Sequence, residues 1–290
     1  MKVYGPLLEK YSDIQEISRD LSDKLLIAVD ICRRAGQIVL GHFEGEIVAE
    51  YKGDIDLVTV ADRKSEKFIV EQLGKLFPDH LILAEEGSGT ESGWEMNLKK
   101  GYKWIIDPLD GTTNFTHDYP HFAISIGLEL DGKVIFGVIY SPLSNEMFVA
   151  VKGMGATLNG KRISVSTVSS LGISILATGF PYDRRTNLNN NVENFSKFIN
   201  KVQGIRRAGA ATLDLCYLAC GRIDGFWELR LKPWDVAAGI IIVEEAGGKV
   251  TNLEGGPFNI YRDDILASNG YLHEEMQMLL NNDRVPLKTS

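Results

Sequence analysis

Two stretches near the start of the chain repeat apolar residues every three or four positions. In the first stretch, residues 21–43, this spacing gathers the apolar side chains on one helical face, and we predict one long helix there. The apolar positions of this stretch are Leu21, Leu25, Ala28, Cys32, Ala35, Val39 and Phe43. A second helix is predicted to begin at residues 59–62 and to end before Pro78, because proline cannot continue a helix.

Short apolar runs separated by turn residues fill the rest of the chain. We predict strands over residues 81–84, 104–106, 123–130, 134–140, 147–151, 173–177 and 223–227, and near Val250, Leu253 and residues 265–267. We predict further helices over residues 192–202, 212–220 and 235–246. This order of elements indicates an α/β (α+β) fold in which helices and sheets form layers. We expect a single domain over residues 1–290, with possible halves 1–160 and 161–290.

The composition is that of an ordinary soluble globular protein and excludes several kinds of partner. The net charge of −8 argues against general nucleic-acid binding and against anionic membrane surfaces. An anionic substrate therefore needs a local cation. The three cysteines provide no disulfide framework, which suits the cytoplasm. Neither a signal-like N-terminal region nor an apolar run of about 20 residues is present, so we expect neither export nor a membrane span.

The segment WIIDPLDGTTNF, residues 104–115, is the most informative in the chain. A buried strand carries Asp107 to its end, and Asp110 returns three residues later after Pro108 fixes the turn. Two converging carboxylates suit Mg²⁺, which prefers oxygen ligands. The backbone N–H groups that follow, at Gly111 and Thr112, are placed to bind a phosphate. The other interpretation is an ordinary surface turn, because Asp, Pro and Gly are common turn residues.

Further acidic residues lie at the ends of other predicted elements. Glu85 and Glu86 follow a short buried strand, and Asp235 lies near the start of an apolar helix. By itself the glutamate pair fits a solvated loop, and Asp235 fits a helix N-cap. Together with Asp107 and Asp110, however, these residues predict a binuclear metal site. Such a site suits hydrolysis of a phosphomonoester, whose charge repels nucleophiles unless cations bind its oxygens.

These residues resemble the inositol monophosphatase family over most of the chain. The resemblance rests on the segment 104–115 and on WDVAAGIIIVEEAGG, residues 234–248, with Glu85 and Glu86 ahead of both. It implies an αβαβα sandwich of the inositol monophosphatase and fructose-1,6-bisphosphatase type, a homodimer, and two or three Mg²⁺ ions per site. The implied reaction is hydrolysis of a small phosphorylated cyclitol or sugar, foremost myo-inositol 1-phosphate, with inhibition by Li⁺.

The resemblance also implies a role for individual residues. The metal ligands it implies are Glu85, Asp107, the Leu109 carbonyl, Asp110 and Asp235. The catalytic group comprises Glu85, Thr112 and Asp62, which orient the attacking water. The candidate substrate contacts are Glu86, Asp110, Gly111, Thr112, Arg206, Gly209, Ala210, Ala211, Glu228 and Asp235. Lys52 lies on a loop expected to close over the site.

Several alternatives stay open on the sequence. Arg206-Arg207 and Leu231-Lys232-Pro233 resemble the bacterial branch of the family, where substrate choice is looser. Fructose-1,6-bisphosphatase activity, alone or shared, is therefore a second hypothesis, and a 3′-phosphoadenosine phosphatase is a third. A regulatory protein- or RNA-binding role on the same fold is a fourth. Apart from the resemblance, Asp62 fits a helix N-terminal acid, Glu228 a strand-end charge and Arg206 a solvated surface residue.

Overall fold

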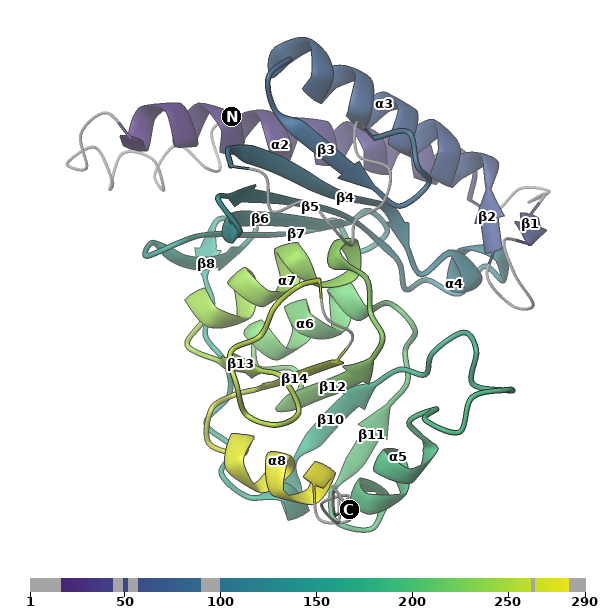
Figure 1. Cartoon of the computed structure of the whole chain (residues 1–290), viewed down its shortest axis with the longest axis vertical. Coiled ribbons are helices and arrows are strands. Elements are labelled where there is room, and N and C mark those ends of the chain that lie inside the picture. Colours follow the sequence, from purple (N-terminus) through teal and green to yellow (C-terminus); the bar gives the residue numbers. More distant parts are fainter. Residues whose placement is uncertain (1–16, 44–48, 52–56, 90–99, 262–263, 282–290) are drawn as a thin grey trace, which may run out of the picture.

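A computed structural model of the chain describes residues 17–43, 49–51, 57–89, 100–261 and 264–281. Two helices form its first layer, α2 (Ile17–Leu40) and α3 (Val60–Leu76). They cover the outer face of a large sheet (Figure 1). The Thr59 hydroxyl caps α3 by accepting hydrogen bonds from the backbone N–H groups of Ala61 and Asp62, at 3.1 and 3.4 Å. Both predicted helices are confirmed.

The large sheet has seven strands in the order β3-β4-β5-β6-β7-β8-β9. Its strands are β3 (Leu81–Ala84), β4 (Tyr102–Asp110), β5 (Ala123–Leu130), β6 (Lys133–Ser141), β7 (Glu146–Val151), β8 (Gly155–Leu158) and β9 (Lys161–Arg162). A small antiparallel pair, β1 (Ala49–Tyr51) and β2 (Leu57–Thr59), precedes α3. The predicted meander over β5 to β7 is confirmed. The strand predicted over residues 104–106 is too short, because β4 stays paired with β5 through a register shift and includes Asp107 and Asp110.

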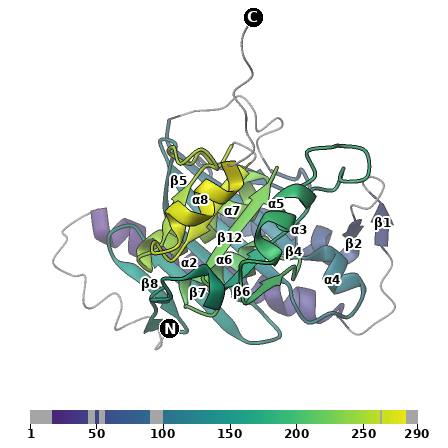
Figure 2. The same ribbon diagram turned by 90° about the horizontal axis from the view of Figure 1, so that it is seen from below.

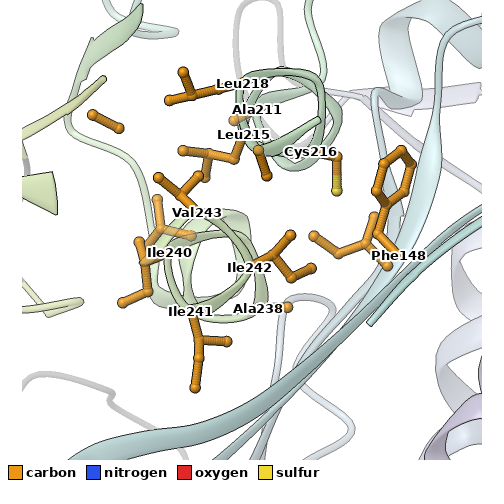
Figure 3. Packing of buried hydrophobic residues seen from close by; sticks show 14 of the residues in the cluster. Phe148, Ala211, Leu215, Cys216, Leu218, Ala238, Ile240, Ile241, Ile242 and Val243 are labelled. Atoms are coloured by element: carbon orange, nitrogen blue, oxygen red, sulfur yellow. The ribbon is translucent and has the colours of Figure 1, made fainter. Parts of the chain in front are cut away.

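The middle layer consists of α6 (Ala211–Ala219) and α7 (Pro233–Glu245), which pack against each other between two sheets. Helix α7 is apolar on nearly every side, and Figure 3 shows Ile240, Ile241, Ile242 and Val243 pointing in different directions around its axis. A helix of this pattern is stable only when it is buried on all sides.

Glycines on the large sheet bring α7 close to it. A Cβ atom at Gly137 of β6 would lie 2.5 Å from the carbonyl oxygen of Ala238. We expect Gly137→Ala to lower the free energy of unfolding by about 1–3 kcal/mol, because either the helix or the sheet has to move. Urea denaturation measures this change. Gly74→Ala in α3 is the matched control, since nothing lies within 4 Å of its added Cβ, and it should stabilise by about 0.5–1 kcal/mol. Equal stability of Gly137→Ala and wild type would contradict this packing argument.

The second sheet has five strands in the order β11-β10-β12-β14-β13. Its strands are β10 (Ile175–Thr178), β11 (Gly204–Arg206), β12 (Gly225–Leu229), β13 (Lys249–Thr251) and β14 (Asp264–Ser268). Helices α5 (Val192–Ile199) and α8 (His273–Asn281) cover its outer face, as the view from below shows (Figure 2).

In the part of the chain that forms the second sheet, the elements that were predicted are mostly of the right kind, helix or strand, but their ends are less accurate. Strand β11 and helix α8 were not predicted. Residues Leu171–Ile173 form a 3₁₀ helix, so the strand predicted from residue 173 begins at Ile175. Leu253 lies in no strand: it is buried within a turn, where Asn252 and Gly256 exchange hydrogen bonds. Its burial explains the apolar signal that was taken for a strand.

The layers follow the order helix, sheet, helix, sheet, helix, so the predicted αβαβα sandwich is confirmed (Figure 1). The division into one domain or two halves stays a prediction. Within the described ranges no helix combines the length and the apolar character needed to cross a membrane.

Candidate active site

The end of β4 presents two carboxylates whose orientation the backbone fixes. Asp107 is buried, and its Oδ1 accepts a hydrogen bond of 3.0 Å from the N–H of Leu109. Asp110 Oδ2 accepts hydrogen bonds from the N–H of Thr212, at 2.8 Å, and from its hydroxyl. Thr212 is on α6, so the second carboxylate joins the large sheet to the middle layer. Each acid is thus held in one direction by the chain itself.

The turn after β4 brings Thr112 against the start of α3. The Thr112 hydroxyl lies 2.9 Å from Asp62 Oδ1 and 3.0 Å from the carbonyl oxygen of Leu109. Both neighbours accept hydrogen bonds, so the single hydroxyl proton is shared between them. Asp62 Oδ2 also accepts a hydrogen bond of 2.8 Å from the N–H of Thr59. The turn needs Gly111, whose φ is +91° and whose Cβ would lie 2.9 Å from the carbonyl oxygen of His121.

Asp235 lies in the first turn of α7. Its Oδ2 accepts a hydrogen bond of 2.6 Å from the backbone N–H of Lys232. The N-cap role considered for Asp235 is therefore wrong: Lys232 is the N-cap, and Asp235 is the third helical residue, which accepts from the N–H of the N-cap. The same side chain lines a cavity together with Asp110. This hydrogen bond and a place at the site are compatible for this residue.

Glu85 and Glu86 follow β3 in a turn that a buried glutamate on α3 holds. The carboxylate of Glu66, which is fully buried, accepts hydrogen bonds from the N–H of Glu86 at 2.6 Å and from the N–H of Ser88 at 2.9 Å. The N–H of Glu85 continues the pairing of β3 with β4 through a bond of 3.3 Å to the carbonyl oxygen of Ile106. Glu85 is thereby placed beside the strand that carries Asp107.

Two supporting residues on α3, Ser65 and Glu66, were missed from the sequence, although a signal for them exists. The Ser65 hydroxyl donates a hydrogen bond of 2.8 Å to the carbonyl oxygen of Pro108, inside the acidic turn. Asp62, Ser65 and Glu66 share the buried face of α3 with Ile69. Polar residues at helical spacing on an otherwise apolar face indicate buried partners elsewhere in the fold.

The carboxylates lie close enough to affect one another's ionisation. Burial raises the pKa of Asp107 well above its ordinary value, and the charges of Glu85, Asp110 and Asp235 raise it further. Burial also raises the pKa of Asp110 to about 6, although the hydrogen bonds from Thr212 oppose this shift. The pKa of Asp235 rises to about 8 through burial and the charge of Asp110. Four acids from three elements thus form one electrostatic cluster.

The cluster fits a hard divalent cation in its chemistry. Its donors are carboxylate oxygens, the ligand type that Mg²⁺ prefers. A buried hydroxyl, Ser125 Oγ, lies on β5 directly opposite Asp107 and has no hydrogen-bond partner among the described residues. Among the described residues, no group of three or more histidine, cysteine or acidic side chains is arranged to hold a metal ion as it stands. The chain nevertheless supplies carboxylates of the type that Mg²⁺ prefers, and a cation would relieve their mutual repulsion.

A cavity of about 620 Å³ opens beside this cluster. The candidate residues that line it are Asp110, Gly111, Gly209, Ala210, Ala211, Glu228 and Asp235. The other described candidates, Asp62, Glu85, Glu86, Asp107, Leu109, Thr112 and Arg206, do not line it. Asp214 on α6 also lines the cavity and was missed from the sequence, where it is a lone acid in an apolar helix. Burial, with the charge of Asp214, raises the pKa of Glu228 to about 8.

Two residues that the sequence analysis assigned to the substrate site, Arg206 and Glu86, do not line the cavity. Both Arg206 and Arg207 are exposed, but only Arg207 lines the cavity, and the guanidinium of Arg206 donates to the carbonyl oxygen of Ile205 at 3.3 Å. Successive residues near the end of β11 point in different directions. Which of the two adjacent arginines lines the cavity therefore depends on where β11 ends, and this strand was not predicted. Glu86 offers its N–H to Glu66 and lies outside the cavity lining. Lys52 lies outside the described residues.

The sandwich and its acidic cluster place the protein in the class of layered α/β phosphatases. The chain belongs to the inositol monophosphatase family, whose family model matches residues 20–287. It is 44% identical to an inositol-1-monophosphatase from Synechocystis over 262 residues, which cover 90% of each chain. It is 42% identical to the Nus factor SuhB of Escherichia coli K12, over 84% of this chain and 91% of that one. A solved inositol monophosphatase from Anabaena superposes with a TM-score of 0.81 at 42% identity, over 91% of this chain and 97% of the other.

Proposed function

We propose that the chain is a Mg²⁺-dependent phosphomonoesterase whose main substrate is myo-inositol 1-phosphate. The observation that carries the metal-dependent chemistry is the burial of Asp107 among the charges of Glu85, Asp110 and Asp235, which raise its pKa, and the choice of substrate is supported by the 44% identical inositol-1-monophosphatase. Buried acids of one sign are destabilising on their own, and they are retained where a cation binds. Glu85, Asp107, Asp110, Asp235 and the carbonyl oxygen of Leu109 would hold the two or three ions.

When bound, Mg²⁺ supplies positive charge for the phosphate oxygens and lowers the pKa of water. The chain contributes the orientation of the nucleophile. When the Thr112 hydroxyl donates a hydrogen bond to Asp62, its lone pairs are free to accept a hydrogen bond from the attacking water. Thr112 and Glu85 would together hold this water so that one of its lone pairs is directed at phosphorus. The N–H groups of Gly111 and Thr112 donate to the phosphate oxygens.

Substrate hydroxyl groups would bind in the cavity. Glu228 accepts hydrogen bonds when it is ionised, and the backbone of Gly209, Ala210 and Ala211, which also line the cavity, supplies donors and acceptors. Glu228 lies against Gly179, where any Cβ would come within 2.0 Å of its Oε1. A glycine at this position leaves space for the carboxylate. Arg207 rather than Arg206 is the candidate cationic contact in this part of the cavity.

A substrate panel tests the proposal. We expect phosphate release from inositol 1-phosphate with Mg²⁺, loss of that release in EDTA, and inhibition by Li⁺ that added Mg²⁺ relieves. Fructose 1,6-bisphosphate and 3′-phosphoadenosine 5′-phosphate are the competing substrates. A kcat/KM at least tenfold higher for the adenosine compound would overturn the assignment of a cyclitol substrate. Failure to hydrolyse any member of the panel would overturn the enzymatic proposal itself.

A regulatory role is a second candidate, because a relative with 42% identity is named as a Nus factor. Genetic complementation separates the two. If a catalytically inactive Asp107→Asn chain restores growth to a deletion strain as well as the wild type does, the regulatory role is the one required. If it fails while it accumulates normally, the enzymatic role is required.

We further propose a homodimer in the cytoplasm, which sedimentation and fractionation can test. All three cysteines are unpaired, in keeping with a reducing compartment.

A further inference from the structure

Arg230 has a backbone conformation that is unusual for a residue with a long side chain. Among the described residues, six other than glycine have a positive φ, and five of them are Asp or Asn. Short polar side chains of this kind tolerate the left-handed region. The sixth is Arg230, with a φ of +59°. Because an arginine gains nothing locally from this conformation, the reason for its presence lies in what its side chain contacts.

Arg230 lies in the turn that joins the second sheet to the middle layer. It follows the last residue of β12, which carries Glu228, and it precedes α7, which carries Asp235. A left-handed residue changes the direction of the chain within a short turn, and glycine adopts this φ without steric cost. The chain therefore keeps a strained residue between a candidate substrate contact and a candidate metal ligand.

The guanidinium group of Arg230 contacts the segment between β10 and α5 at two points. It forms an ion pair and a hydrogen bond with the carboxylate of Asp183, and it donates a hydrogen bond of 2.5 Å to the carbonyl oxygen of Asn189. A hydrogen bond from Asn187 and the charge of Arg230 both lower the pKa of Asp183, so this carboxylate stays ionised for the pair. One side chain thus joins both ends of the segment.

The segment makes few other polar contacts with the rest of the fold. Among the described residues, the remaining hydrogen bonds of residues 183–190 are made within the stretch 181–192. Its apolar side chains bury little surface, since Leu188 is 98% exposed and Tyr182 is 57% exposed. Arg230 therefore supplies the hydrogen bonds that hold residues 183–190 to the rest of the protein.

The same segment forms one wall of the cavity beside the acidic cluster. Pro181, Tyr182, Arg184 and Arg185 line this cavity, and Figure 1 shows the segment reaching out from the second sheet before α5 begins. The position of the wall decides how closely the cavity encloses a ligand. The acidic cluster lies on other elements, so a displaced wall should weaken substrate binding and leave the reacting groups in place.

We propose that Arg230 is a positioning residue for substrate binding, which fixes residues 181–190 as a wall of the cavity through Asp183 and Asn189. This inference rests on the proposed function, which places the substrate in this cavity. A wall that is fixed before the substrate arrives lowers the entropic cost of binding. KM therefore depends on Arg230, whereas kcat is set at the acidic cluster.

Kinetics with inositol 1-phosphate and Mg²⁺ test this role. We expect R230Q and D183N each to raise KM at least fivefold, with kcat within twofold of wild type. Asparagine at position 183 keeps an oxygen for the hydrogen bond from Asn187, so D183N removes mainly the charge that pairs with Arg230. The double variant should have the KM of R230Q, because both changes remove the same contact. A KM effect equal to the product of the two single effects would overturn the pairing.

R230G separates the side-chain contact from the backbone conformation. Glycine adopts the positive φ without strain and has no guanidinium group, so its KM should rise as in R230Q. A wild-type KM in R230G would overturn the inference. R222Q is the matched control, because Arg222 forms a comparable ion pair with Glu146 and lies outside the cavity lining. It should keep the wild-type KM.

Amide hydrogen exchange tests the contact without catalysis. We expect exchange over residues 183–190 to be at least tenfold faster in R230Q and D183N than in the wild type, and unchanged in R222Q. Unchanged exchange in R230Q would overturn the inference, even if KM rises. Faster exchange in R230Q, together with a wild type that hydrolyses no member of the substrate panel, would instead overturn the proposed function and with it the role in substrate binding.

Discussion

Asp107→Asn is expected to lower kcat by roughly 10³-fold, equivalent to about 4 kcal/mol of transition-state stabilisation. Asparagine retains the oxygen that accepts the Leu109 N–H, so the turn after β4 can keep its shape. What is lost is a negative charge at the centre of the acidic cluster. Steady-state phosphate release at saturating Mg²⁺ and substrate measures the effect, and calorimetry should show weaker Mg²⁺ binding.

The same variant is expected to be more stable than the wild type in EDTA at neutral pH. The pKa of Asp107 is raised in the folded chain, so the folded state binds a proton more readily than the unfolded state. The charged wild-type residue therefore costs stability as the pH rises above the ordinary carboxyl range, and the neutral asparagine avoids that cost. Each kcal/mol gained raises Tm by roughly 2–4 °C in a chain of this size. The advantage should shrink as the pH falls.

Asp30→Asn on the exposed face of α2 is the matched control, since Asp30 forms only a surface pair with Arg34. It should change neither kcat nor Mg²⁺ affinity. Wild-type turnover in Asp107→Asn would contradict the metal assignment. A large fall in Tm in EDTA would instead show that Asp107 supports the fold. In that case the loss of activity would follow from unfolding and would not identify Asp107 as a metal ligand.

Thr112→Ala is expected to lower kcat by roughly 10²-fold while leaving Mg²⁺ affinity close to wild type. The variant removes the hydroxyl that lies 2.9 Å from Asp62, and with it the group proposed to accept a hydrogen bond from the attacking water. The metal ligands proposed for the site stay in place, so calorimetry should show wild-type Mg²⁺ affinity while kinetics show the lower kcat. Asp62 keeps its hydrogen bonds from Thr59, so only a small loss of stability is expected.

Thr112→Ser is the control, because serine keeps the hydroxyl and loses only a methyl group. Its kcat should lie within a few-fold of wild type. If Thr112→Ala lost Mg²⁺ affinity but kept kcat, the proposed role in orienting water would be wrong. If serine and alanine were equally slow, the methyl packing of Thr112 rather than its hydroxyl would be the important feature.

A local sequence motif predicted only part of the active site. Asp107, Asp110 and Gly111 belong to one strand and one turn, so their spacing and turn chemistry were readable within a dozen residues. From α3, Ser65 donates to the carbonyl oxygen of Pro108 in this turn, and Glu66 holds the turn after β3 that carries Glu85 and Glu86. Their contacts depend on how α3 crosses the sheet, which no local pattern specifies. The choice of Arg207 over Arg206 likewise depended on β11, a strand of three residues with little apolar signal.

The layered fold and the strand and turn that carry Asp107 to Thr112 were predictable before the structure, because hydrophobic periodicity and turn chemistry act over neighbouring residues. Which carboxylates share one electrostatic environment, and which arginine lines the cavity beside them, followed from the packing of distant elements. These relations join α3, β4, β11, α6 and α7, which meet only when the two sheets pack around the middle layer. Charge interactions depend on distance and burial, and sequence separation fixes neither.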